Sequence, residues 1–140
     1  MHKNDFIGRR VYTSDISIDG ESVKIRWKAF FDKRLEEDLS VDHLGNNAVF
    51  GINRGHCRHL AEGENGIEAM TFEGWGGLKV SRLEDRHHAV IARPTMPPDE
   101  DNPYHCEISR QNHGDRPAAE SLAFELVLLC SGTLGFIPKA

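Results

Sequence analysis

Long apolar segments are absent from this 140-residue sequence, and their absence limits where the chain can reside. The longest apolar run, Leu126–Cys130, is far too short to span a bilayer. The residues that follow Met1 also lack the apolar stretch of a signal peptide. We therefore expect a cytoplasmic protein that does not enter a membrane.

An excess of positive charge is missing as well. The formal net charge is -5, whereas non-specific binding to nucleic acid depends on Lys and Arg side chains that meet phosphates. Nucleic acid is therefore disfavoured as a partner. With 39% hydrophobic and 28% charged residues, the composition is that of a globular protein, and the length fits a single domain over residues 1–140.

Cysteine is scarce, and the familiar metal and hydrolase motifs are missing. The sequence contains neither a closely spaced cysteine pair nor H-E-x-x-H, and no G-x-S-x-G elbow surrounds Ser40. The three cysteines, an odd number without disulfide spacing, suit a reducing compartment. We predict that Cys57, Cys106 and Cys130 are small buried hydrophobic residues.

A glycine-rich segment, Gly74–Gly77, lacks the Lys-Ser/Thr ending of a phosphate-binding loop. We predict that it connects two strands of a hairpin and that Trp75 packs on the sheet. The alternative is a mobile lid in which Trp75 closes over a ligand.

The N-terminal region has the pattern of a β-hairpin. Val11–Ile18 favours a strand, and Asp19–Gly20 is a turn signal. Beyond the turn, one side carries Val23, Ile25, Trp27 and Ala29, and the other carries Lys24, Arg26 and Lys28. The basic side is either a solvated strand that protects a sheet edge or a surface for an anionic ligand or partner.

Two helices are predicted. The C-terminal helix has Asp115 as its N-cap, Pro117 in its first turn and Gly132 at its end. Its apolar stripe consists of Ala119, Leu122, Ala123, Leu126, Val127 and Cys130. A weaker helical pattern covers Ala48–Leu60 and is interrupted by glycines. Before it, Ser40 or Asp42 could cap a helix, which would explain both residues without any chemistry.

Further strands complete an α+β fold. They are predicted at Ile67–Phe72, Leu78–Leu83, His88–Ala92 and Tyr104–Ser109. Between the last two, the proline-rich segment Arg93–Pro103 excludes regular structure, because proline removes a donor and restricts φ. We expect a mainly antiparallel sheet of roughly five or six strands, with the C-terminal helix packed on one face.

The strand after the proline-rich loop offers candidate site residues. Alternation places His105 and Glu107 on one face, and Tyr104, Cys106 and Ile108 on the other. A histidine beside a carboxylate can act as a general base with an orienting partner. The same two residues could instead form an ordinary surface pair.

A second group of histidines suggests a metal site. On a helix, His56 and His59 would lie on one face, and together with His105 and Glu107 they could hold zinc or a related metal. The alternative is that these histidines are surface or capping residues.

Two stretches carry a resemblance to known proteins. Ala29–Phe30 with Leu39–Asp42, and later Asn102–Ile108, resemble segments of a group of small uncharacterised bacterial proteins. The group has no established activity, so the resemblance implies only that Ser40, Asp42 and His105 belong to one site. The chain also resembles, more faintly, ADP-ribosyltransferase-like toxins. This likeness rests on the order in which Arg26, Ser40 and Glu107 follow one another along the chain.

Three functions follow as hypotheses. The favoured one is a small bacterial binding or accessory module that recognises a protein partner or small ligand near His105. The second is a hydrolase or transferase that uses His105 as base with Glu107 or Asp42 as orienting carboxylate and Ser40 in the site. In this site Arg26, Lys28, Arg58 and Trp75 are the candidate ligand-binding residues. The third is the metal site of His56, His59 and His105. The sequence specifies neither a cofactor nor an oligomeric state.

Overall fold

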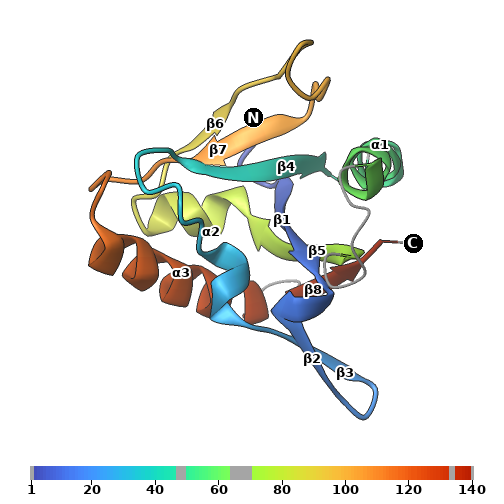
Figure 1. Cartoon of the computed structure of the whole chain (residues 1–140), viewed down its shortest axis with the longest axis horizontal. Helices are drawn as coiled ribbons and strands as arrows, with labels where there is room; N and C mark the ends of the chain where they lie inside the picture. The colour runs from blue at the N-terminus through green and yellow to red at the C-terminus, as the bar shows by residue number, and fades with distance from the viewer. Residues whose placement is uncertain (1, 47–49, 64–70, 133–134, 140) are drawn as a thin grey trace.

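The computed structural model describes residues 2–46, 50–63, 71–132 and 135–139, which form an α+β fold (Figure 1). The strands are β1 (Phe6–Tyr12), β2 (Ile16–Asp19), β3 (Ser22–Ile25), β4 (Leu39–Gly45), β5 (Phe72–Lys79), β6 (Val90–Ala92), β7 (His105–Ile108) and β8 (Gly135–Pro138). The α-helices are α1 (Phe50–Gly63), α2 (Val80–Asp85) and α3 (Arg116–Ser131), and the 3-10 turns are η1 (Thr13–Asp15) and η2 (Trp27–Phe30).

Six strands form one sheet in the order β6-β7-β4-β1-β5-β8. Every neighbouring pair in it is antiparallel. The strands β2 and β3 form a separate hairpin whose turn contains Gly20 with a φ of 63°, a value that glycine adopts readily. The predicted fold class and the predicted hairpin turn are both confirmed.

The helix α3 covers one face of the sheet, as its apolar stripe predicts. Asp115 accepts a hydrogen bond from the amide of Ala118, Pro117 lies in the first turn, and Gly132 follows the last. The helix residues that are fully buried against the sheet are Ala119, Ala123, Leu126 and Cys130. Together with η2, this helix encloses the larger core, whose members include Ile7, Val11, Phe30, Leu39, Leu78 and Ile108.

The helix α1 packs on the other side of the sheet and covers only part of it (Figure 1). Its Cys57 and Ala61 meet Phe72 and Trp75 in a second, smaller core. The structure describes this helix from Phe50, and the predicted start at Ala48 lies outside the described part of the chain. The uncovered part of this face is where the candidate site lies.

The predicted helix cap at Ser40 or Asp42 is wrong, because Leu39–Gly45 is the strand β4 in the middle of the sheet. Leu39 and Val41 join the larger core, whereas Leu44 joins the smaller one. Both faces of β4 therefore carry apolar residues. For this reason its sequence does not show the regular alternation of polar and apolar residues that is typical of a half-buried strand.

The predicted hairpin connection at Gly74–Gly77 is also wrong, because these residues lie inside β5. The glycines are there for close packing: a Cβ on Gly76 would come within 2.6 Å of the Phe30 ring. The predicted strand at Leu78–Leu83 ends at Lys79 and continues as α2. Of the predicted strand Ile67–Phe72, residues 67–70 lie outside the described part.

The predicted strand Val11–Ile18 is interrupted by η1, where Asp15 accepts a hydrogen bond from the amide of Tyr12. The alternation beyond the turn also ends early, because β3 stops at Ile25 and Trp27–Phe30 is the turn η2. The predicted strands at His88–Ala92 and Tyr104–Ser109 correspond to β6 and β7. Within the described ranges, no helix is both long and apolar enough to cross a membrane.

Candidate functional site

The site is a cleft at the place where two neighbouring strands of the sheet separate. The pairing of β1 with β4 is recorded only from Phe6 to Gly8, whereas β1 stays paired with β5 as far as Tyr12. Beyond Gly8, β1 turns away from β4 toward the β2–β3 hairpin (Figure 1). The space between the two strands is a cleft of about 440 Å³ that is open to solvent.

A buried carboxylate closes one side of the cleft. Asp42 accepts hydrogen bonds from Arg10 Nε (2.9 Å) and Nη2 (3.2 Å), from Trp75 Nε1 (2.9 Å) and from Asn102 Nδ2 (3.2 Å). Arg10 also donates to Glu100 over 2.8 Å. Burial opposes the charge of Arg10, but Asp42 and Glu100 more than offset this and raise the pKa of its guanidinium above the ordinary value.

Because four donors already saturate Asp42, it does not orient His105. Its role is to tie β1, β4, β5 and the loop that carries Asn102 and Glu100 into one wall. The structure thus gives Asp42 a structural place beside the cleft rather than the catalytic place suggested for it from the sequence.

Next to Asp42 on the same strand, a serine contacts a histidine of β7. Nε2 of His105 lies 3.2 Å from Oγ of Ser40, and Nδ1 lies 2.8 Å from the carbonyl oxygen of Arg93. A carbonyl can only accept, so in the neutral ring Nδ1 carries the proton and Nε2 accepts from the serine hydroxyl. Ser40 and His105 both line the cleft, and this contact agrees with the predicted grouping of the two residues.

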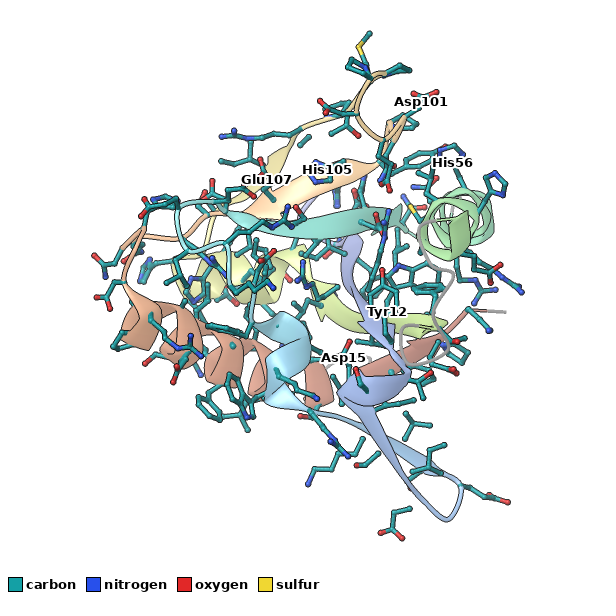
Figure 2. All side chains as sticks on the ribbon, viewed as in Figure 1. Tyr12, Asp15, His56, Asp101, His105 and Glu107 are labelled. Atoms are coloured by element: carbon teal, nitrogen blue, oxygen red, sulfur yellow. The ribbon has the colours of Figure 1, made fainter. Side chains whose placement is uncertain are left out.

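Glu107 takes no part in this contact. It is on the same face of β7 as His105, as alternation predicts, and Figure 2 shows the two side chains along that strand. Its Oε1, however, forms an ion pair with Nε of Arg93 at 3.0 Å. The orienting group of His105 is therefore a backbone carbonyl rather than a carboxylate.

A half-buried arginine of β1 lines the cleft beside the backbone of Ser40. Arg9 donates from Nε to the carbonyl oxygen of Ala29 (3.0 Å) and from Nη1 to that of Ser40 (2.8 Å). Its ion pair with Asp32 is long, at 3.8 Å from Nη2, and Asp32 is also bound by Arg34 at 2.9 Å. Burial lowers the pKa of Arg9 below its ordinary value, and Asp32 only partly opposes this effect.

Of the predicted ligand-binding residues, only Lys28 lines the cleft, where its side chain is exposed. Arg26 lines a different groove, and Arg58 pairs with Glu62 along α1 at 2.7 Å. The lid hypothesis for Trp75 is wrong, because its side chain is fully buried in the smaller core.

The predicted metal ligands do not converge. His56 on α1 lies beside the loop that carries Asp101 (Figure 2), and its Nε2 is 3.3 Å from the carbonyl oxygen of that residue. His105 is instead held by Ser40 and Arg93. Over residues 2–46, 50–63, 71–132 and 135–139, no three His, Cys, Asp or Glu side chains are grouped as metal ligands.

Cysteine chemistry is disfavoured by burial. All three thiols are free and buried, as the sequence predicts. Burial raises the pKa of Cys106 and of Cys130 to about 12, and burial together with the nearby Asp42 also raises that of Cys57. These thiols remain protonated near neutral pH.

Sequence patterns did not identify the arginine pair of β1. Arg9 and Arg10 point to opposite faces of a central strand, yet both line the cleft because β4 no longer covers that edge. Two adjacent arginines before Val11 were the available signal. Tyr12 at the end of β1, Asp15 of η1 and Glu100 of the 93–103 loop also line the cleft. Figure 2 shows Tyr12 and Asp15 at the far end of β1.

Comparison with protein-family models, with curated proteins and with solved structures gives no match to this chain. The resemblance to small bacterial proteins on Ala29–Phe30, Leu39–Asp42 and Asn102–Ile108 therefore stays a prediction. Functional inference has to come from the site itself.

Proposed function

We propose that this protein is a binding module for a small anionic ligand and that the ligand occupies the cleft between β1 and β4. The observation that supports this most directly is the state of Arg9. Its guanidinium is half-buried and clamped by two carbonyl oxygens, and its ion pair with Asp32 is long. A bound carboxylate or phosphate would add a closer negative charge than the one that Asp32 provides.

Four further cleft residues suit the same ligand, while the carboxylates of Asp15, Asp99 and Glu100 also line the cleft and restrict where an anionic group can bind. Lys28 and Arg34 line the cleft together with Arg9, and each comes from a different segment of the chain. Ser40 on β4 and His105 on β7 line the same cleft, with a hydroxyl and an imidazole that can bind hydroxyl or amide groups. The ligand that fits best is therefore a small polar molecule with one anionic group, because about 440 Å³ lies within the usual range for such sites.

Native mass spectrometry of the purified protein, with a denatured control, is the first experiment. A mass excess that disappears on denaturation identifies a co-purified ligand. The same protein is then titrated by calorimetry with phosphorylated and carboxylated metabolites. We expect Arg9→Met to weaken binding by at least about tenfold and Lys28→Met by about fivefold, because each removes a charge-assisted contact.

Lys33→Met is the matched control, since Lys33 is exposed and is not among the residues that line the cleft. Thermal unfolding of each variant shows whether the fold is intact, and Lys28→Met at an exposed position keeps the test valid if Arg9→Met is unstable. The proposal fails if Lys28→Met and Lys33→Met bind the ligand equally well and Arg9→Met binds as the natural protein does.

The contact between Ser40 and His105 supports a second candidate function, a hydrolase or transferase that uses the serine as nucleophile. His105 is held in the tautomer that accepts the serine proton. A fluorophosphonate probe tests this: Oγ of Ser40 would bond to phosphorus, fluoride would leave, and Nε2 of His105 would take the proton. A mass increase absent from Ser40→Ala and slowed in His105→Ala is expected for the enzyme, and no mass increase excludes it.

The version of this enzyme that resembles ADP-ribosyltransferase-like toxins has less support. It needs Arg26, Ser40 and Glu107 in one site, but Arg26 lines another groove and Glu107 binds Arg93.

The three free cysteines favour a reducing compartment, and we propose the cytoplasm on that ground.

A further inference from the structure

A second hollow lies between the β2–β3 hairpin, the C-terminal half of α3 and the strand β8. Its volume is about 730 Å³, and it does not share Ser40, His105 or Arg9 with the cleft. The apolar residues that line it include Val23, Ile25, Trp27, Phe124, Leu128 and Phe136. We call this hollow the hairpin groove.

Part of the apolar surface of α3 is exposed at this groove. Leu128 is 73% exposed and Phe124 is 48% exposed, whereas the sheet-facing residues of the same helix are buried. The ring of Phe124 stacks on that of Trp27 at a centroid distance of 4.7 Å, so the groove has an aromatic wall. The helix therefore carries a second apolar stripe on a side that the described sheet does not cover, a pattern typical of a surface that binds another molecule.

The charges of the hairpin groove all have one sign. Lys24, Arg26 and Lys28 line it, and its described lining contains no carboxylate. The protein as a whole is acidic, with a formal net charge of -5. A basic, apolar groove on an acidic protein is complementary to an occupant that is acidic and apolar at once.

We infer that the hairpin groove binds an acidic amphipathic helix of a partner protein. Phe124 and Leu128 are four residues apart on α3, with Val127 between them. Side chains at this spacing form a ridge on the helix surface, and a second helix can pack against such a ridge. Acidic side chains on the flanks of the partner helix would meet Lys24 and Arg26. The apolar face of the partner helix would cover Leu128 and the edge of Trp27.

Two other occupants fit less well. A second copy related by a two-fold axis would bring the same basic residues together, which costs free energy. A membrane surface receives apolar side chains that project outward, whereas Trp27 and Phe136 line a hollow.

The test uses a synthetic peptide of about 20 residues, long enough for a five-turn helix, with Leu and Phe at i, i+3, i+4 and i+7 and Glu on the other face. A matched peptide carries Lys in place of every Glu. Binding is followed by tryptophan emission, because Trp27 lines the groove whereas Trp75 is fully buried. We expect saturable binding of the acidic peptide, tighter than that of the basic peptide by at least about tenfold.

Two variants identify the groove as the binding site. Lys24→Glu with Arg26→Glu, and separately Leu128→Ser, should each weaken binding of the acidic peptide by at least about tenfold. Lys33→Glu with Arg82→Glu is the control, because it changes the charge equally at exposed positions outside the groove. Lys28 is left in place because it also lines the cleft, so the two proposals are tested separately.

Equal affinity for the two peptides would overturn the inference, and so would an equal loss in the control variant. It would also be overturned if the protein bound phosphatidylserine vesicles but not the peptide. Self-association that Leu128→Ser abolishes and that the peptide does not compete with would identify a second copy as the occupant instead.

Discussion

The indole nitrogen of Trp75 on β5 lies 2.9 Å from Oδ2 of Asp42 on β4, although β1 runs between these two strands. The bond crosses β1 at Gly8, which pairs with Asp42 on one side and with Gly77 on the other. The absence of a side chain at Gly8 lets the indole lie across the strand. This arrangement joins three central strands directly beside the cleft.

We therefore predict that Gly8→Ala destabilises the protein. A Cβ at this position would lie 2.7 Å from Cβ of Trp75, so the indole would have to move away from Asp42. We expect a loss of about 2–3 kcal/mol in the free energy of unfolding, measured by urea denaturation. Gly55→Ala on α1 is the control: nothing lies within 4 Å of its Cβ, and alanine should stabilise the helix by about 0.5–1 kcal/mol. A neutral Gly8→Ala would show that the indole has room to shift.

Replacement of Asp42 should be more costly than replacement of Glu100, which also binds Arg10. The side chain of Asp42 is 3% exposed and that of Glu100 is 23% exposed, so solvent compensates much less for the loss of Asp42. We expect Asp42→Asn to lower the free energy of unfolding by about 3 kcal/mol, because it leaves a buried cation without its main partner. Glu100→Gln should cost about 1 kcal/mol or less. Similar losses in both variants would contradict a central role for Asp42.

The sequence predicts the helices and strands that are specified by a local pattern of residues. α3 was predictable because its N-cap, its proline and its apolar stripe all agree over sixteen residues. The face of His105 and Glu107 was predictable because alternation alone determines it. β4 was not, because its two faces join different cores and Asp42 is satisfied by Arg10, 32 positions away in the chain.

The same reasoning applies to the cleft. Gly74–Gly77 resembles a loop in sequence. Glycine is explained inside this strand by packing that the sequence does not show: the backbone of Ile137 lies against Gly74 and the ring of Phe30 against Gly76. The contribution of Arg9 and Arg10 depends on the point at which β1 leaves β4, and this is a property of the whole sheet. Periodicity in one segment carries no information about that point.

The thiols should be inert in the folded protein. With the pKa of Cys106 and Cys130 raised to about 12 by burial, the thiolate fraction at pH 8.5 is below about one in a thousand. We expect slow reaction of all three cysteines with Ellman's reagent in buffer and fast reaction in 6 M guanidinium, roughly at the rate of a free thiol. A Ser121→Cys variant adds an exposed thiol on α3 that should react at once. Rapid labelling of a native cysteine would show that its core opens easily.

Asp38 should make the protein sensitive to acid. Burial alone would raise the pKa of its carboxyl, but hydrogen bonds from the Arg110 amide (2.9 Å) and from Nε2 of His113 (2.7 Å) hold it below the ordinary value. In the unfolded chain these bonds are gone and the carboxyl titrates near pH ~3.9. Its contribution to stability is therefore complete above that pH and is lost as the pH falls through the lower pKa of the folded state.

The measurement is the free energy of unfolding in urea at a series of pH values between about 7 and 3, the range over which carboxylates titrate. Asp38→Asn should be less stable than the natural protein by about 1 kcal/mol at pH 7, because a charged acceptor becomes neutral. The difference should shrink at the acidic end, where Asp38 itself becomes protonated. Asp19→Asn, at an exposed position of the β2–β3 hairpin, removes the same charge and should leave the slope unchanged. A constant difference between Asp38→Asn and the natural protein over the whole range would mean that the stabilisation by Asp38 does not depend on its charge.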